Sequence, residues 1–175
     1  APDAKGPTSF TAYLKDGRIL TYGRNGIDQT STLETKRVAS VAPAPNGSIF
    51  VDPNVVTQTE SVRAVWAIGL LEDRPGNQIR FLYLQPTAPP TSPGPPGTAT
   101  NLYPSRIEYT GFRSTPWDGQ RSVRFVYQDA QADEFAFLSG LPTLNTKRLA
   151  RIEMHAPNPI EPALVRSYNL EYSAP

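Results

Sequence analysis

The chain has 175 residues, of which 38% are hydrophobic and 19% are charged, and 17 basic against 16 acidic residues leave a net charge of +1. This composition is typical of an ordinary globular chain, and it excludes an acidic disordered tail and a generic nucleic-acid-binding surface. The absence of cysteine and the single histidine, His155, exclude disulfides, thiolate chemistry and a multi-histidine metal site. Residues 1–175 are expected to form one domain, a piece of a longer protein, with no apolar run of the ~20 residues that cross a bilayer as a helix.

The N-terminal part of the sequence predicts a hairpin. Residues 10–14 and 18–22 read as two strands, and Asp16-Gly17 between them is typical of a two-residue hairpin turn. Asn25-Gly26 has the same turn character. Two further pairs of this kind, Asn46-Gly47 and Asp118-Gly119, predict reversals later in the sequence.

The clearest strand of the sequence covers residues 62–70, where apolar side chains occupy every second position. It is followed by a predicted type II turn, because Pro75 fixes its own φ near −65° and Gly76 can take a positive φ. The backbone then reverses into a second strand over residues 79–83.

The residue pattern of this second strand recurs in two later segments, which are called its echoes below. Residues 123–127 repeat the β-branched, Arg, Phe, aliphatic, Tyr pattern of residues 79–83, and residues 168–172 keep its outline. An Arg-Ile-Glu-apolar motif precedes each echo, at residues 106–109 and again 45 positions later at residues 151–154. Regular spacing of this kind predicts one hairpin repeated about three times, and thus an all-β domain built on an antiparallel sheet.

Alternation also assigns the faces of this sheet. The Arg and Glu side chains of the two motifs point away from the Ile side chains, and we expect this charged face to be solvated and to act on register and solubility. The Asp16-Gly17 and Pro75-Gly76 turns are expected to fix the strand register. The opposite, apolar face should be held by six aromatic residues: Trp66, Phe81, Tyr83, Phe125, Tyr127 and Tyr172.

Residues 86–100 are rich in proline and poor in apolar side chains. Proline has no backbone N–H to give to a strand ladder, so we expect an exposed loop with polyproline character. Because strands of the same repeat series lie on both sides of it, the segment is expected to be an insertion inside the domain.

No catalytic constellation emerges from the residues. His155 has no nucleophile motif near it and is expected to lie in a turn at the end of a strand. The pair Glu72-Asp73 could act as an acid and a base or bind a cation, but an Asp at the start of a Pro-Gly turn normally binds its own backbone. Three acidic residues resemble a crude calcium loop without its glycine or its closing glutamate: Asp129, Asp133 and Glu134. We therefore expect no metal and no cofactor.

The arginines are also candidates for a phosphate-binding or nucleic-acid-binding set. Thirteen of the 17 basic residues are arginine, and Arg80, Arg124 and Arg166 fall beside apolar strand positions that also carry aromatics. The net charge of +1 and the absence of a glycine-rich phosphate loop argue against such a site.

The order and spacing of several segments resemble the N-terminal domain shared by Salmonella plasmid virulence B-proteins and the B components of insecticidal toxin complexes. The resemblance covers roughly residues 8–173 and is carried by five stretches: residues 10–23, Trp66 with residues 73–79, residues 103–111, residues 123–127 and residues 146–149.

This resemblance implies a structural role. The B component and its C partner resemble a hollow shell of strands, related to rearrangement-hotspot repeats, that encloses a toxic enzyme until a pore-forming A component delivers it. By this resemblance the protein is a non-enzymatic part of an exported toxin whose partners are other domains of the same polypeptide, a C-type component and possibly an A component. The transferase of the virulence proteins is not expected here, because no Glu-x-Glu pair occurs.

Two other hypotheses remain open at this stage. One is an extracellular module that binds a glycan or a host surface through an exposed Trp117 and the Pro-rich loop. The other is an unrecognised hydrolase that uses Asp73 and His155.

Overall fold

The computed structural model describes residues 3–26, 30–40, 58–88, 98–115, 117, 120–157 and 162–173. These residues form strands, turns and loops, and none of them is helical, which confirms the all-β prediction. The strands belong to one sheet, antiparallel apart from a single short parallel pairing. In sequence order they are β1 (Phe10–Tyr13), β2 (Ile19–Arg24), β3 (Thr30–Ser40), β4 (Gln58–Trp66), β5 (Ile68–Glu72), β6 (Asn77–Leu84), β7 (Ala99–Thr100), β8 (Tyr103–Phe112), β9 (Ser122–Leu138), β10 (Leu141–Pro157) and β11 (Pro162–Asn169).

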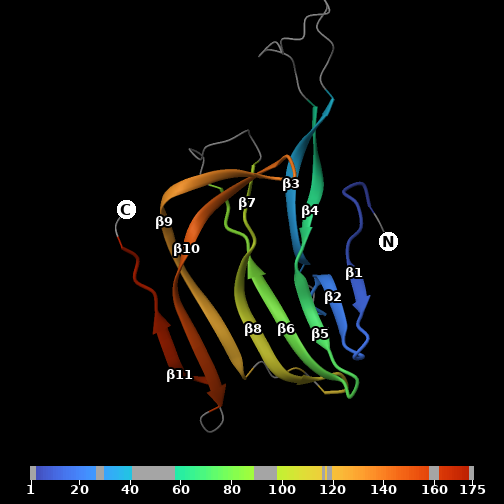
Figure 1. Cartoon of the computed structure of the whole chain (residues 1–175), viewed down its shortest axis with the longest axis vertical. Coiled ribbons are helices and arrows are strands. Elements are labelled where there is room, and N and C mark those ends of the chain that lie inside the picture. Colours follow the sequence, from blue (N-terminus) through green and yellow to red (C-terminus); the bar gives the residue numbers. More distant parts are fainter. Residues whose placement is uncertain are drawn as a thin grey trace, which may run out of the picture.

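The order of the strands across the sheet is β11-β10-β9-β8-β6-β5-β2-β3-β4. From β5 to β11 the strands follow one another across the sheet in sequence order, apart from the short β7, which pairs in parallel with β10. β1 pairs with β2 and lies next to the N-terminus, whereas β11 forms the opposite edge near the C-terminus (Figure 1).

The hairpin turns predicted at Asp16-Gly17 and Pro75-Gly76 are present, but each loop has three residues where two were expected. Gly17 and Gly76 have φ angles of 88° and 103°. The N–H of Gly17 bonds the C=O of Leu14, and the N–H of Gly76 bonds the C=O of Asp73, so each loop has three residues with glycine third. The two-residue turn at Asp16-Gly17 and the type II turn centred on Pro75-Gly76 are therefore wrong. A glycine in this third place supplies the left-handed residue of a bulge that realigns the strands.

The long strand predicted over residues 62–70 is broken at Ala67. β4 ends before this residue and pairs with β3, whereas β5 begins after it and pairs with β2 and β6. The N–H of Ala67 bonds the C=O of Ser31, and its C=O accepts from the N–H of Gly23. Apolar alternation continues through the break, which is why the sequence shows no sign of this change of partner.

The best-buried part of the molecule lies where the sheet curls over on itself. β9 and β10 run past the other strands, reverse at Ser139 and Gly140, and arch toward β3 (Figure 1). There the hydroxyl of Thr35 on β3 donates to the C=O of Pro142 on β10 over 2.8 Å. The large apolar side chains Leu33, Tyr103 and Leu144 are buried in the described part of the protein.

Polar side chains fill much of the same core. The hydroxyl of Tyr103 donates to the side chain of Asn145 over 2.6 Å and accepts the N–H of Thr146 over 2.8 Å. Buried polar groups stabilise a core only when they are hydrogen-bonded, so this tyrosine also ties β8 to β10.

The Pro-rich segment departs from its prediction at its end. Ala99 and Thr100 form β7, and Thr100 is buried with its hydroxyl bonded to the C=O of Pro86. The expectation that residues 86–100 are exposed and stay out of the sheet is therefore wrong for these two residues. The insertion's centre, residues 89–97, lies outside the described residues, as do the Asn46-Gly47 and Asp118-Gly119 turns.

We predict that Leu144 is a principal contributor to stability, because its side chain is 0% exposed. Leu144→Ala should lower the free energy of unfolding by about 3 kcal/mol through lost burial and a cavity. Phe137 on the same hairpin is 65% exposed, and Phe137→Ala should change stability by less than about 0.5 kcal/mol. Denaturant unfolding of both variants tests this placement of the core, and equal losses would contradict it.

Candidate functional site

Two pairs of neighbouring strands, β6–β8 and β9–β10, have the same register at the repeated motif; the boundary between the strands of each pair is called a seam below. On the seam between β6 and β8, Arg80 lies opposite Glu108 and Phe81 lies opposite Ile107. On the seam between β9 and β10, the corresponding residues 44 or 45 positions later repeat this arrangement. Arg124 lies opposite Glu153, and Phe125 lies opposite Ile152.

The hairpins themselves also agree. In β8–β9, Ile107 pairs with Val123 and Glu108 pairs with Ser122. In β10–β11 the residues 45 positions later pair in the same way, Ile152 with Tyr168 and Glu153 with Ser167. Of the hairpin predicted to occur about three times, two copies, β8–β9 and β10–β11, are thus confirmed as a repeat of register.

The three tyrosines that end the repeated segments have equivalent hydrogen bonds. Tyr83, Tyr127 and Tyr172 each donate their hydroxyl to a backbone carbonyl oxygen on an earlier strand, over 2.6 to 2.9 Å. The acceptors belong to Ile68, Pro104 and Leu149. The last two again lie 45 residues apart. The hydroxyl positions explain why tyrosine rather than phenylalanine recurs in this place.

The six predicted spine aromatics differ in burial. Five of them are half-buried: Trp66, Phe81, Tyr83, Phe125 and Tyr127. Tyr172 is 47% exposed, with the guanidinium of Arg148 4.8 Å from its ring centre, so its assignment to the apolar spine is wrong. The reason is its place after β11, where no strand in the described part of the protein lies beyond it.

The charged face is covered at its centre rather than solvated. The side chain of Glu108 is only 3% exposed and is paired with Arg106. Trp117, from the connection between β8 and β9, lies against Gly111, where a Cβ would fall 1.7 Å from the indole ring. The prediction of a solvated face is therefore wrong at Glu108.

Arg80 stacks on the same indole, with its guanidinium 4.1 Å from the ring centre of Trp117. Burial lowers the pKa of Arg80, and the charge of Glu108 opposes this shift. Nε of Arg80 and Nε1 of Trp117 are both buried without a hydrogen-bond partner. The exposed Trp117 on which the glycan-binding hypothesis relied is thus a wrong prediction, because the ring packs on the sheet.

One unit further along, Glu153 occupies the position of Glu108. It accepts a hydrogen bond from Nε of Arg151 over 2.7 Å and pairs with Nε2 of His155 over 3.0 Å. The hydrogen bond from His155, and then that from Arg151, lower the pKa of Glu153. His155 lies within β10 and not in a strand-end turn, which corrects that prediction.

The structure does not assemble the residues considered for catalysis or metal binding. The side chain of Asn77 donates a hydrogen bond to the carboxylate of Asp73, and this is the largest cause of its lowered pKa. The N–H groups of Asn77 and Gly76 also donate to this carboxylate and lower its pKa further. Asp73 directly follows β5 and His155 lies within β10, and three strands, β6, β8 and β9, lie between β5 and β10. Asp129 is paired with Lys147. Within the described ranges, no cluster of three His, Asp or Glu side chains could hold a metal ion.

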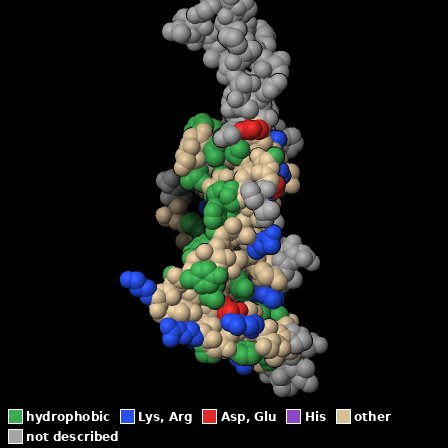
Figure 2. Space-filling model, turned by 90° about the vertical axis from the view of Figure 1, so that its right-hand side faces the viewer, with side chains coloured by type: hydrophobic (Ala, Val, Ile, Leu, Met, Phe, Trp, Pro, Cys, Tyr) green, Lys and Arg blue, Asp and Glu red, His purple; other side chains and the backbone are tan. Residues whose placement is uncertain are grey.

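The sequence does not predict the contacts by which residues 3–6 are held against β3 and β4, which are called the N-terminal clamp below. Arg63 on β4 donates to both carboxylate oxygens of Asp3 over 2.7 and 2.8 Å and to the C=O of Gly6. Lys5 pairs with Glu34 on β3, and its C=O accepts the N–H of Arg63. Figure 2 looks onto this side of the molecule, where basic and acidic side chains lie next to each other. Arg63 and Asp3 are 60 positions apart in the sequence, and no local pattern predicts their contact.

No protein-family model matches this protein, and a search of the curated proteins also found no match. The resemblance described above therefore stays a prediction. Among the residues that the structure describes, no helix is long and apolar enough to cross a membrane.

We predict that the two equivalent glutamates differ in their importance. Glu108→Gln should cost about 3 kcal/mol, because the carboxylate that it removes is only 3% exposed, is paired with Arg106 and lies opposite Arg80. Glu153→Gln should cost less, because the side chain of Glu153 is 15% exposed and that of Arg151 beside it is 43% exposed. Urea unfolding of the two variants checks this ranking, and the reverse order would contradict the burial of Glu108.

We also predict an acid-sensitive N-terminal clamp. Hydrogen bonds from Arg63 and from the N–H of Lys5 lower the pKa of Asp3 from 3.8 to about 2. A lowered pKa in the folded state stabilises the protein above pH 3.8, and this contribution is lost as the pH falls through 2. The thermal midpoint of the wild type should exceed that of Asp3→Asn at pH 6, and the difference should vanish near pH 2. A difference that persists at pH 2 would contradict the ion pair.

Proposed function

We propose that this protein is a non-enzymatic β-sheet domain of an exported bacterial toxin, and that it helps build or dock the protein shell that encloses a toxic effector. The observation that carries the proposal is the repeated register of hairpins β8–β9 and β10–β11. A sheet that grows by addition of equivalent hairpins is suited to extend around a large object, as stacked repeat units do elsewhere. The sequence resemblance to toxin-complex B components agrees with this geometry.

The contacts of the charged residues support structural roles. Glu108 and Glu153 neutralise arginines on the face of the sheet, and Asp73 holds a hairpin loop. Asp129 pairs with Lys147 across the seam between β9 and β10. Each of these carboxylates has a contact that accounts for its position without a substrate.

The partners that follow from this proposal are other domains of the same toxin polypeptide and a toxin C-type component, with a pore-forming A component as a further candidate. The domain would act outside the producing cell after export. Its near-neutral charge does not favour nucleic acid as a partner. The glycan-binding hypothesis is not carried forward, because no contact of Trp117 supports it.

The proposal is tested in the complete protein from which this domain derives. The intact protein, co-expressed with its C-type component, should protect the effector from added protease. Deletion of residues 1–175 should expose the effector to cleavage, whereas the surface substitution Phe137→Ala should leave it protected. Equal protection with and without this domain would refute a role in the shell.

A further inference from the structure

β11 is the third member of a series whose first two members each have a partner strand. β6 and β9 are equivalent, and each carries an Arg-Ile-Glu strand on its outer side, β8 and β10 respectively. β11 takes the place of β9 in the last hairpin, with the same register to the strand before it. In the described part of the protein, no strand lies on the outer side of β11.

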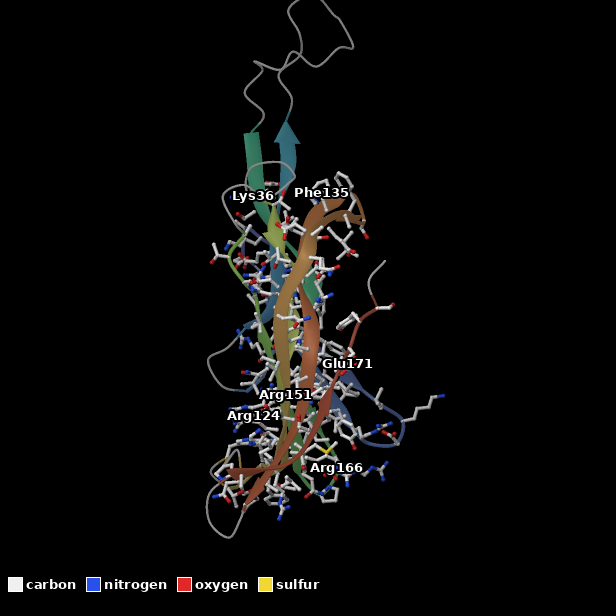
Figure 3. All side chains as sticks on the ribbon, turned by 90° about the vertical axis from the view of Figure 1, so that its left-hand side faces the viewer. Lys36, Arg124, Phe135, Arg151, Arg166 and Glu171 are labelled. Atoms are coloured by element: carbon white, nitrogen blue, oxygen red, sulfur yellow. The ribbon has the colours of Figure 1, made fainter. Side chains whose placement is uncertain are left out.

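The backbone of this edge is directed outward at known positions. The N–H of Leu170 bonds the C=O of Ala150 over 2.9 Å, so the backbone groups of this residue are directed toward β10. Hydrogen-bonding direction alternates along an antiparallel strand, so Ser167, Asn169 and Glu171 present their N–H and C=O groups to the open side. Figure 3 views the sheet from this edge, with Arg166 and Glu171 on the segment in front.

The side chains of the edge are exposed, although several are apolar. The exposed fractions are 54% for Leu164, 66% for Val165 and 47% for Tyr168. Exposed apolar edge strands without lysine or an internal proline are sites where another strand readily pairs. At the opposite end of the sheet, the N-terminal clamp occupies part of the outer side of β4, where the N–H of Arg63 bonds the C=O of Lys5.

We propose that the outer edge of β11, together with Leu170 and Glu171 directly after it, binds an extended strand of Arg, β-branched residue, Glu sequence, antiparallel and in the register that β8 and β10 already use. This inference rests on the proposed function, because it names the kind of segment to which the domain docks. The equivalence fixes the pairing. The incoming Glu lies opposite Asn169, the β-branched residue opposite Leu170, and the Arg opposite Glu171.

The charge at the last of these positions fits the occupant. Inside the sheet, the arginines of the two motifs lie opposite neutral residues, Arg106 opposite Leu82 and Arg151 opposite Val126. At the open edge the equivalent residue is Glu171, which offers an incoming arginine an opposite charge directly across the strands. A carboxylate at this position thus favours a basic residue on the partner strand.

The test uses the whole 175-residue protein labelled with ¹⁵N and a peptide with the sequence of residues 148–156, the segment that occupies the equivalent place on β9. Addition of the peptide should shift the amide resonances of Ser167, Asn169 and Glu171. Asn169→Pro removes one outward N–H and should weaken binding about tenfold. Asn169→Ala keeps this N–H and is the matched control, with affinity close to that of the wild type.

A charge exchange tests the register. Glu171→Arg should weaken binding of the peptide, and a peptide whose Arg at the place of Arg151 is replaced by Glu should restore it. Failure of this rescue, equal binding by Asn169→Pro, or shifts confined to β9 would overturn the inference. A dimer of the free protein that Asn169→Pro abolishes would also overturn it, because the occupant would then be a second copy. None of these results changes the protease-protection test of the shell.

Discussion

The register between each Arg-Ile-Glu strand and the strand beside it decides which side chains this sheet covers. A shift of one residue would move Ile107 and Ile152 to the charged face and Glu108 and Glu153 to the apolar face. Because both seams and both hairpins keep one register, the protein repeats the same separation of faces in successive units. The hairpin loops and the tyrosine hydroxyl bonds act on this same alignment.

The environment of the repeated positions changes along the sheet although their register does not. Glu108 is paired with Arg106 and only 3% exposed, while Glu153 in the next unit is 15% exposed. Tyr127 packs against Tyr103 with ring centres 5.3 Å apart, while the equivalent Tyr172 is exposed. The repeated side chains are therefore more exposed to solvent in the units nearer β11. Beyond β11, the described residues provide no strand equivalent to β8 and β10.

Sequence reasoning was sufficient for the features that depend on local alternation and on spacing. The strand over residues 79–83, its echoes and the offset of 45 residues all follow from side-chain types that recur at short range. The break at Ala67 could not be predicted, because a change of partner strand leaves the apolar alternation intact. The loop lengths at Gly17 and Gly76 were missed because a glycine with positive φ suits a two-residue and a three-residue loop alike.

The candidate site was harder to predict, because it depends on contacts between distant segments. Alternation placed Glu108 on the face opposite Ile107, but it could not predict that this side chain is only 3% exposed. Nor could it predict that Trp117 stacks on the neighbouring Arg80 from a connection without periodicity. The clamp between Asp3 and Arg63 joins residues sixty positions apart. Charge patterns on one strand reveal the face of a residue, while its burial depends on what distant parts of the sequence place above it.

The most direct test of this account is a nuclear Overhauser measurement of the Hα pairs that face each other across the two repeated hairpins. The account predicts strong Hα–Hα contacts between Arg106 and Arg124 and between Arg151 and Asn169, because both are close pairs without mutual hydrogen bonds in the observed register. A contact in one hairpin and a register shifted by one residue in the other would contradict the equivalence of the units.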